Sequence, residues 1–530
     1  MANFSSRLLP TLLVLSGLTM TNNASAASPS KQVIDQKIQQ IMEQFQVPGA
    51  AIGIIHRGKI IQAQGYGIKT LGQAAPVDAD SIFKIASNTK AFTTAALAIL
   101  VDEGKISWDG KVREYLPDFK MHDPWVSEHF TIIDLLTHRS GLGLGAGDLM
   151  LWPEPSSFTR EEVLHNLRYL KPAGEFRADY AYDNLLYIVA GELIPAVTGL
   201  SWEDFVEKRI MLPLDMQHCF AGQVSKARQS DVATPHGIVA GKLQTIVRPI
   251  DYSKPSVSAA AGGIQCSLND MLKWVKVQLA NGKIDQQHSL YSTEQQQKMW
   301  QAHTIMPVSK RSKELDNTHI SAYGLGWRMN DMNGQWQVHH TGSLAGMYSF
   351  VSLFPELELG FVVLTNQQSS AARSALMYTV MKPYLGDHKT DWLAIFSPKT
   401  SNQVNTEQAE MQASLSPITP SQKGSSDYLG KYDDPWLGRF TIEVDTSSPD
   451  MALKIHSSRV SQFVGKLYKQ TETDMALIRW DERSLEADAI IQFKRDNKGQ
   501  INGMTMAPAS KDIDFSYDFA DLDFTKITSE

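Results

Sequence analysis

The chain has 530 residues, of which 42% are hydrophobic and 20% charged, and its formal net charge at pH 7 is −7. That length exceeds one ordinary core and predicts roughly two to four domains. The weakly acidic balance gives no support for a nucleic-acid partner, which normally requires a basic face.

Residues 1–26 are predicted to be a secretory signal peptide. Arg7 supplies the positive charge, an apolar run covers 8–20, and Ala24-Ser25-Ala26 matches a cleavage site. The apolar run is too short to span a bilayer, and no later segment has the length and apolarity of a membrane span. We therefore expect an exported, periplasmic protein without a membrane span.

The first half of the mature chain predicts a helix, a hairpin and then several helices. Apolar residues recur at helical spacing between Ile34 and Phe45, and residues 50–67 have the pattern of two strands joined at Arg57-Gly58. Further helices are expected at 130–142, at 184–199, closed by Gly199, and at 267–283, capped by Ser267.

Strands return late in the main part of the chain. Consecutive antiparallel strands are predicted at 323–329, 336–342, 347–355 and 359–366, and a helix follows from about 371 to 384. Pairing of these strands with the early hairpin would give one antiparallel sheet flanked by helices, with an inserted helical region. The predicted fold class is therefore α+β rather than a series of βαβ units.

The chain beyond residue 386 has a different pattern. Residues 387–426 are polar and predict a linker or a loose helix. Short strands are then expected at "RFTIEVD", "MALKIHS", "DMALIRW", "AIIQFKR", "INGMTMA" and "DFSYDFA". They predict a small all-β barrel or sandwich, so we divide the chain into a signal peptide (1–26), a main domain (27–386), a linker (387–426) and a β-domain (427–530).

The chain has only two cysteines, Cys219 and Cys266. An oxidising compartment permits a bridge between them, but their spacing does not require one, and we expect two buried free thiols. Neither cysteine lies in a motif that lowers the pKa of a thiol, so a thiol enzyme is not predicted. The histidines form no metal-binding motif, and neither a metal nor a cofactor is expected.

The first candidate for chemistry is Ser87-Asn88-Thr89-Lys90. Ser87 and Lys90 are three residues apart at the start of a helix, so both side chains lie on one face. A nucleophilic serine needs a base within hydrogen-bond reach, and a desolvated lysine can serve as that base. Taken alone, the motif fits a helix cap better, and the tetrapeptide from Ser28 to Lys31 has the same pattern.

Two later motifs favour the catalytic interpretation. Tyr182-Asp183-Asn184 stands just before a helix; a tyrosine near a lysine can move a proton, although Tyr180 is an alternative for that role. The alternative for Asn184 is a helix N-cap. His340-Thr341-Gly342-Ser343 ends a strand, along which a substrate backbone can lie, and the backbone N–H groups of Ser87 and Ser343 can form an oxyanion hole.

Together, the three motifs resemble the serine β-lactamase and penicillin-binding superfamily. Because tyrosine stands in the middle motif, the chain is similar to the branch of class C β-lactamases, D-alanyl-D-alanine carboxypeptidases, D-aminopeptidases and related esterases. "LLTHRSGL" and "AAGGIQCSLNDMLKW" also resemble this family. The C-terminal "YLGKYDD" and "YDFADLDFTKI" resemble a lipocalin-like barrel, which can cover the site, restrict substrate size or mediate assembly.

The resemblance implies a role for each motif residue. Ser87 would be the acylated nucleophile, Lys90 and Tyr182 the proton-transfer pair, and Asn184 the residue that positions a substrate amide. His340 and Thr341 would line the substrate strand, and Gly342 would leave room there. Whether Lys90 or Tyr182 is the general base depends on coupled pKa values and is left open.

The function implied is a periplasmic serine hydrolase acting through an acyl-enzyme on D-amino-acid-containing peptides or amides, cell-wall fragments or small esters. His340 stands where β-lactamases usually carry lysine, and a histidine is mostly neutral at pH 7, so weak or no β-lactamase activity is expected. The alternative is a non-catalytic protein on the same scaffold that binds peptidoglycan or a partner. The substrate, the role of the barrel and a homo-oligomeric state are left open.

Overall fold

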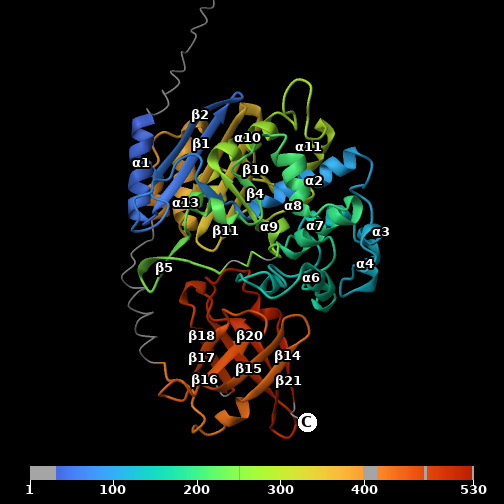
Figure 1. The fold of residues 1–530 in the computed structure, drawn as a ribbon, viewed down its shortest axis with the longest axis vertical. Helices are drawn as coiled ribbons and strands as arrows, with labels where there is room; N and C mark the ends of the chain where they lie inside the picture. Colours follow the sequence, from blue (N-terminus) through green and yellow to red (C-terminus); the bar gives the residue numbers. More distant parts are fainter. Residues whose placement is uncertain (1–30, 250, 253, 398–414, 471–473, 528–530) are drawn as a thin grey trace, which may run out of the picture.

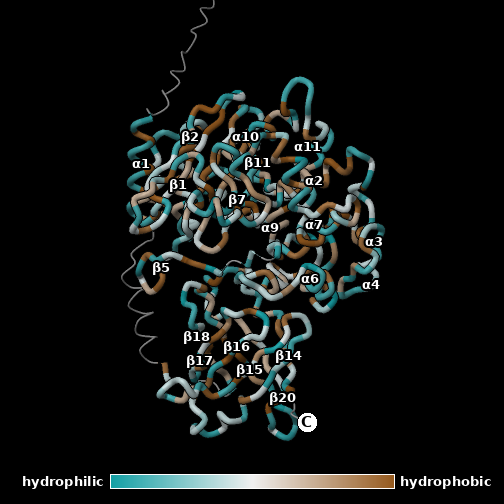
Figure 2. The backbone as a smooth tube through the Cα atoms, viewed as in Figure 1, coloured by the Kyte–Doolittle hydropathy of each residue, from teal (hydrophilic) through white to brown (hydrophobic). Residues whose placement is uncertain are grey.

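The computed structural model describes residues 31–249, 251–252, 254–397, 415–470 and 474–527, and the predicted signal peptide lies outside them. The described chain forms an α+β part with a large antiparallel sheet and a C-terminal β-barrel below it (Figure 1). The predicted fold class is therefore confirmed. In Figure 2 hydrophobic segments run through the interior of both parts, and hydrophilic segments mark the outer turns.

The large sheet joins the early hairpin to the late strands, as the sequence predicted. In spatial order its strands are β2 (Lys59–Gly67), β1 (Gly49–His56), β13 (Leu359–Thr365), β12 (Met347–Phe354), β11 (Gln335–Leu344), β10 (Arg328–Met332), β9 (Ser321–Tyr323) and β8 (Thr304–Ile305). The pairing that links the early hairpin to the late strands joins β1 to β13, more than 300 residues apart in sequence, as with Ala50 opposite Thr365.

Helices cover both faces of this sheet. On one face, Ile52 and Ile54 of β1 pack with α1 (Lys31–Gln44) and α13 (Ser370–Met381). On the other face lies α10 (Leu268–Leu279), and a Cβ at Gly53 would lie 2.8 Å from Leu272 of that helix. Because both faces are covered, β1 is a nearly continuous apolar strand.

The helical region is packed around two apolar helices, α2 (Thr89–Asp102) and α7 (Leu185–Thr198). Gly199 ends α7 with a φ of 72°, and the Ser267 hydroxyl caps α10 by accepting a hydrogen bond from the Asp270 N–H, as expected. The remaining helices in the described residues are α3 (Val112–Tyr115), α4 (Pro124–His129), α5 (Ile132–Leu136), α6 (Arg160–Asn166), α8 (Trp202–Val206), α9 (Ala259–Gly262), α11 (Thr293–Met299), α12 (Lys310–Asp316) and α14 (Trp392–Phe396).

Among the described residues, no single helix is long and apolar enough to cross a membrane. The helix α7 together with residues 202–211 reaches that length and composition only as a pair bent by 79°.

The prediction of one strand at 323–329 is wrong in one respect, because two separate strands, β9 and β10, meet this range. β9 ends at Tyr323 and β10 begins at Arg328. The turn between them contains Gly326 with a φ of 79°, and a Cβ there would lie 2.9 Å from the backbone oxygen of Lys90. The break therefore allows the chain to approach the start of α2 closely.

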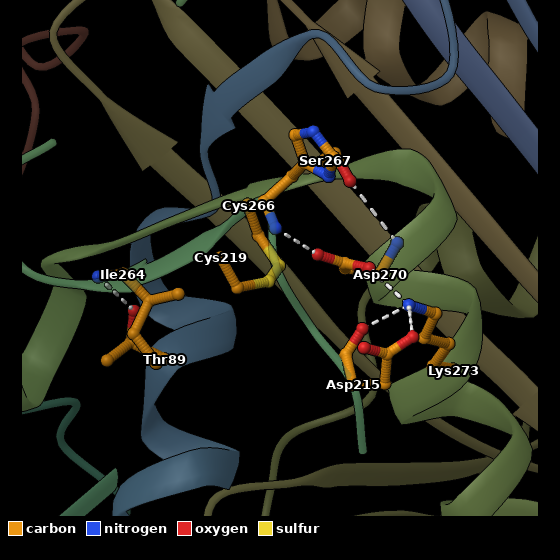
Figure 3. Close-up of a disulfide and its surroundings, with 9 residues drawn as sticks. Thr89, Asp215, Cys219, Ile264, Cys266, Ser267, Asp270 and Lys273 are labelled. Atoms are coloured by element: carbon orange, nitrogen blue, oxygen red, sulfur yellow. Dashed lines mark hydrogen bonds and ion pairs between the residues drawn. A yellow bond between two sulfur atoms is a disulfide. The ribbon is translucent and has the colours of Figure 1, made fainter. Parts of the chain in front are cut away.

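The expectation of two free thiols is also wrong, because Cys219 and Cys266 form a disulfide (Figure 3). They lie directly opposite each other on β4 (Cys219–Ala221) and β7 (Ile264–Ser267), with their Cα atoms 4.1 Å apart. On its other edge, β7 pairs with β3 (Ile82–Lys84), the strand that leads to Ser87. The bridge thus lies in the small sheet whose strand β3 leads to the motif that begins at Ser87.

The C-terminal strands form a closed antiparallel barrel. They are β14 (Gly430–Asp434), β15 (Gly438–Val444), β16 (Leu453–Ser457), β17 (Val464–Lys469), β18 (Met475–Trp480), β19 (Ala489–Arg495), β20 (Ile501–Pro508) and β21 (Asp523–Ile527). Aromatic side chains fill the interior; Phe463, for example, lies 4.8 Å from Trp480 between ring centroids.

The expected strand "DFSYDFA" is wrong. Residues 514–520 form turns and a short 3₁₀ segment in the connection between β20 and β21. We call residues 509–522 the barrel loop. Its Phe519 is fully buried in the barrel, whereas Phe515 and Ser516 extend toward the α+β part. The loop therefore spans the two parts of the molecule, which alternation along a strand does not predict.

Part of the predicted linker is ordered helix. Residues 392–396 form α14, whose Trp392 is buried beside Tyr378 of α13 with 4.9 Å between ring centroids. Residues 398–414 lie outside the described part of the chain.

Candidate active site

Ser87 lies in a tight turn between β3 and α2. The residue before it, Ala86, has a φ of 48°, a left-handed conformation that is uncommon for a residue with a side chain. The turn is held from β12, because the Ser349 hydroxyl donates to the Ile85 carbonyl at 2.7 Å and accepts from the Asn88 side chain at 2.7 Å. The first motif thus stands on a fixed backbone at the start of a helix.

The Ser87 side chain contacts Lys90. Nζ of Lys90 donates to Oγ of Ser87 at 3.3 Å, and no side-chain cap is formed at the start of α2 by its N-cap residue, Asn88. The spacing of three residues therefore brings the two side chains together on one helix face, as predicted.

Lys90 is fully buried, and its Nζ donates hydrogen bonds to three acceptors. Besides Ser87, Nζ donates to Oδ1 of Asn184 at 2.6 Å and to the carbonyl of Ala261 at 2.9 Å. Burial lowers the pKa of Lys90 to about 7, although the carboxyl groups of Asp148 and Asp183 act in the opposite direction. A substantial fraction of Lys90 is therefore neutral at pH 7, and a neutral amine can accept a proton.

Tyr182 lies beside the Lys90 ammonium group. Nζ of Lys90 is 4.9 Å from the ring centroid, and the guanidinium of Arg328 is 5.5 Å from the same centroid. Burial raises the pKa of Tyr182 well above its ordinary value, while the neighbouring Ser87 hydroxyl and Arg328 act against that rise. The Ser87 and Tyr182 hydroxyls do not form a hydrogen bond of normal geometry. Tyr182 therefore keeps its proton at neutral pH.

Tyr180, the alternative to Tyr182, has a different environment. Its hydroxyl accepts a hydrogen bond from Nη2 of Arg328 at 3.3 Å, and burial raises its pKa. Both tyrosine rings lie near His138 and Tyr323, but only Tyr182 lines the cavity that contains Ser87.

Asn184 bridges the second motif to Lys90. Its Oδ1 accepts from Lys90, and its Nδ2 donates to Oδ2 of Asp148 at 2.7 Å. Asn184 occupies the N-cap position of α7 but makes no side-chain cap, since Oδ1 of Asp183 accepts from the Leu186 N–H instead. The Asn184 side chain thus forms a hydrogen bond with Lys90 and does not cap the helix.

The third motif lies on the part of β11 that borders the cavity. The pairing of β10 with β11 ends at Arg328 opposite His339, so β11 extends beyond β10 from His340 to Leu344. Thr341 and Ser343 line the cavity, together with Ser87. An extended substrate can add to such a free strand edge.

Gly342 permits close approach of β11 to the Ser87 turn. A Cβ at this position would lie 2.2 Å from the Ile85 carbonyl oxygen and 3.1 Å from the Cβ of Ala86. A side chain would therefore push the strand away from the nucleophile. The Arg373 guanidinium of α13 also holds the strand, since Nη1 donates to the Gly342 carbonyl at 3.0 Å and to Oγ of Ser343 at 2.9 Å.

His340 is a buried, neutral histidine. Its Nδ1 lies 2.7 Å from the Thr341 carbonyl, which can only accept, so Nδ1 carries the proton and Nε2 accepts from the Tyr323 hydroxyl at 3.0 Å. Burial lowers the pKa of His340 well below its ordinary value, and the cations Arg328 and Lys90 lower it further. No positive charge is therefore offered by His340 to a substrate carboxylate.

The cavity around Ser87 has a volume of about 610 Å³ and is lined by both parts of the molecule. The barrel contributes Phe515 and Tyr517 of the barrel loop to its wall. The Phe515 ring is edge-on to Tyr182, with 5.7 Å between centroids. The barrel thus forms one wall of the site.

Other contacts fix the barrel against the α+β part. Arg459 of the barrel forms an ion pair with Glu162 at 2.9 Å, and the Asn166 side chain donates to the Trp436 carbonyl at 2.8 Å. Both α+β residues lie on α6, which faces the barrel (Figure 1).

Sequence reasoning missed several residues of this site, among them Asp148, Arg328, Arg373 and Phe515. Asp148 follows a glycine-rich run, and Arg328 begins a strand; neither position has a recognisable chemical signature. The only signal in the sequence for Phe515 was its place in an aromatic stretch that was interpreted as a strand.

The chain matches two family models. One, described as Beta-lactamase, matches residues 34–384, and the other, a domain of unknown function named DUF3471, matches residues 415–526. The second match coincides with the barrel.

Curated relatives and a solved structure show similarity over most of the chain. The Unguisins hydrolase ungD' of Aspergillus campestris is 27% identical over 80% of this chain and 79% of its own length. Protein flp of Staphylococcus aureus is 28% identical over 64% of each chain. The octameric penicillin-binding protein homologue from Pyrococcus abyssi, at 22% identity and a TM-score of 0.57, covers 93% of this chain and 99% of that one, and shares the fold.

Proposed function

Because the chain belongs to the Beta-lactamase family, we propose that it is a serine hydrolase that works through an acyl-enzyme. The observation that carries the proposal is the contact between Ser87 and a buried Lys90 whose pKa is lowered to about 7. A nucleophile next to a base that is partly neutral at pH 7 is the arrangement that covalent catalysis requires.

In the acylation step, Oγ of Ser87 attacks the substrate carbonyl carbon, and its proton passes to Nζ of neutral Lys90. The carbonyl oxygen becomes an oxyanion, stabilised by the backbone N–H groups of Ser87 and Ser343. Lys90 is favoured as the base over Tyr182, because burial keeps the tyrosine protonated.

The leaving group then needs a proton. Tyr182, protonated and adjacent to Lys90, gives its proton to the leaving nitrogen or oxygen and regains one from the Lys90 ammonium. The carbonyl re-forms as the bond to the leaving group breaks, which leaves an ester on Ser87. Water, deprotonated by the same pair, hydrolyses this ester and restores the free enzyme.

The proposed substrates are D-amino-acid-containing peptides or amides, cell-wall fragments or small esters. The cavity volume of about 610 Å³ is in the range of small-ligand sites, and the exposed edge of β11 suits an extended backbone. The relative from Aspergillus campestris is named as a hydrolase of unguisins.

Weak β-lactam hydrolysis is part of the proposal. His340 is neutral and hydrogen-bonded to Tyr323 and Thr341, so it provides no cation for a carboxylate. The substitution His340→Lys is expected to lower KM for carboxylate-bearing substrates but not for neutral esters. An unchanged KM for both would contradict this role.

We further propose that the protein is exported to the periplasm. The disulfide between Cys219 and Cys266 supports an oxidising compartment. Intact-mass analysis of protein from fractionated cells should find a chain that begins after Ala26 in the periplasmic fraction; a cytoplasmic, uncleaved chain would contradict the proposal. Light scattering on that material distinguishes a monomer, which is lighter than the 58.9 kDa of the full chain by the residues removed, from an assembly.

The decisive experiment uses a fluorescent phosphonate and mass-spectrometric mapping of the adduct. Wild-type protein should be labelled on Ser87, and Ser87→Ala should not be labelled. Ser370→Ala is the matched control, because Ser370 lines the same cavity. Absence of any Ser87 adduct would favour a non-catalytic binding protein. A panel of D-aminoacyl amides, D-Ala-D-Ala peptides, nitrocefin and nitrophenyl esters then ranks substrates.

A further inference from the structure

Asp148 is a fully buried carboxyl group outside the three motifs. It begins a short 3₁₀ segment, Asp148–Met150, that lies between α7 and the barrel. Its Oδ2 accepts two hydrogen bonds, one from Nδ2 of Asn184 and one from Oγ of Ser516, each at 2.7 Å. Oδ1 is buried and has no hydrogen-bond partner among the described residues.

These contacts extend into an unbroken chain of hydrogen bonds between the two parts of the molecule. Ser516, in the barrel loop, bonds to Asp148; Asp148 bonds to Asn184; and Asn184 accepts from Nζ of Lys90 at 2.6 Å. Ser516 and Lys90 are more than 400 residues apart in sequence.

The backbone beside Asp148 is also held by the barrel. The Gly147 N–H donates to Oδ2 of Asp518, at 2.8 Å, and Gly147 has a φ of 73°. A Cβ at Gly147 would lie 2.5 Å from Leu185 at the start of α7. The position of Asp148 is therefore set from two sides, by α7 and by the barrel loop.

A buried carboxyl group with an unpartnered oxygen is costly for folding, and an apolar side chain would fill the same space at lower cost. Such a group next to a reactive lysine is typical of a functional position. We infer that Asp148 is a positioning residue that orients Asn184 toward Lys90, and that the docked barrel loop, through Ser516, holds Asp148 in that orientation. The inference rests on the proposed function.

The charged and titratable groups around this chain of bonds come from several elements. Asp183, Arg328, His138 and His340 surround Lys90 together with Asp148, and Asp183 and Asp518 lie near Asp148. Burial raises the pKa of Asp148 well above its ordinary value, and the hydrogen bonds from Ser516 and Asn184 and the charge of Lys90 act against that rise. The ionised form of Asp148 raises the pKa of Lys90 against the larger effect of burial. Removal of Asp148 is thus expected to lower the pKa of Lys90 only at pH values at which the Asp148 carboxyl group is ionised.

The test compares Asp148→Asn, Asp148→Ala and Ser516→Ala in the full chain, with Lys511→Ala, an exposed position on the barrel loop, as the control. Acylation by a nitrophenyl ester is measured by stopped flow from pH 5 to 9, and thermal unfolding is recorded for each variant. Asp148→Asn keeps an acceptor for Asn184 but cannot ionise, so it should retain most of the acylation rate, and its pH profile should be displaced toward lower pH where Asp148 is ionised in wild type.

The other variants test the hydrogen bonds. Ser516→Ala should slow acylation about two- to tenfold, mainly through kcat and not KM, since one partly buried hydrogen bond to a carboxyl group is lost. Asp148→Ala leaves the Asn184 amide without its acceptor and should slow acylation on the order of five- to hundredfold. Lys511→Ala should match wild type.

A wild-type acylation rate in Ser516→Ala, or in a folded Asp148→Ala, would overturn the inference. If Asp148→Ala does not fold, the other two variants, which are close to isosteric, carry the test. A purely structural role would lower the unfolding temperature and leave kcat of the folded enzyme unchanged. Failure of the proposed function is recognised separately, because wild-type Ser87 would then not be acylated at all.

Discussion

Nζ of Lys90 lies 3.3 Å from Oγ of Ser87 and has no exposure to solvent. The same burial that permits this contact lowers the pKa of the lysine, so geometry and proton affinity have one cause. The two motif residues are therefore linked by packing of the helical region around α2 as much as by their spacing.

The acylation rate should depend on pH through Lys90. Below a pH of about 7 the lysine is protonated and cannot accept the Ser87 proton, so the rate should fall about tenfold per pH unit. Above that pH the rate should reach a plateau. Burst-phase kinetics with a nitrophenyl ester measure the profile. A midpoint near 10, the ordinary range of an exposed lysine, would contradict the role of burial.

Tyr182 and Tyr180 form a matched pair for substitution. Tyr182→Phe should lower kcat by roughly 10²- to 10⁴-fold, because the proton path to the leaving group is lost. Tyr180→Phe removes only an acceptor of Arg328 and should lower kcat less than tenfold. The contrast is measured by steady-state kinetics on one amide substrate. Equal losses, or a larger loss in Tyr180→Phe, would show that the proton-transfer roles are assigned wrongly.

Gly342 is expected to tolerate no side chain. In Gly342→Ala the new Cβ would meet the Ile85 carbonyl at 2.2 Å, so β11 must move away from the Ser87 turn. We expect a loss of about 1 to 3 kcal/mol in unfolding free energy, as for overpacking, with a large loss of acylation. Gly174→Ala is the control, since a Cβ there has no neighbour within 4 Å. Urea unfolding and phosphonate labelling test both effects; an active, stable Gly342→Ala would refute the steric argument.

Local features of the sequence were sufficient to predict much of the α+β part. The spacing of Ser87 and Lys90 is a property of one helix, and apolar periodicity predicted α1, α7 and α10. Strand patterns predicted β1, β2 and β11 to β13, and the structure brings the residues of all three motifs to one cavity.

Features that depend on tertiary contacts could not be predicted in this way. Cys219 and Cys266 pair because β4 and β7 are neighbours, which a separation of 47 residues does not indicate. Asp148 became recognisable only through contacts with Asn184 and the barrel loop. "DFSYDFA" alternates like a strand, but its aromatic residues divide between the barrel core and the cavity.

The disulfide should stabilise the α+β part. Closing a loop of 47 residues contributes about 2 to 4 kcal/mol, so reduction, or the double substitution of Cys219 and Cys266 by serine, should lower the unfolding free energy by that amount. Urea unfolding with and without reductant measures the loss in wild type, and the double variant serves as the reductant-insensitive control. Two thiols that react with an alkylating agent before reduction would contradict the bridge.

The barrel loop should limit the size of the substrate at the Tyr182 side of the cavity. Phe515 lies edge-on to Tyr182, 5.7 Å between centroids, and borders the cavity from the barrel. Phe515→Ala removes the ring and should raise kcat/KM for bulky acyl esters relative to acetyl esters. Truncation of a partly exposed aromatic residue in a loop should change stability little, and Lys511→Ala provides the control for substitution in the same loop. If the ratio of bulky to small substrate remained that of wild type, Phe515 would not be the residue that limits substrate size.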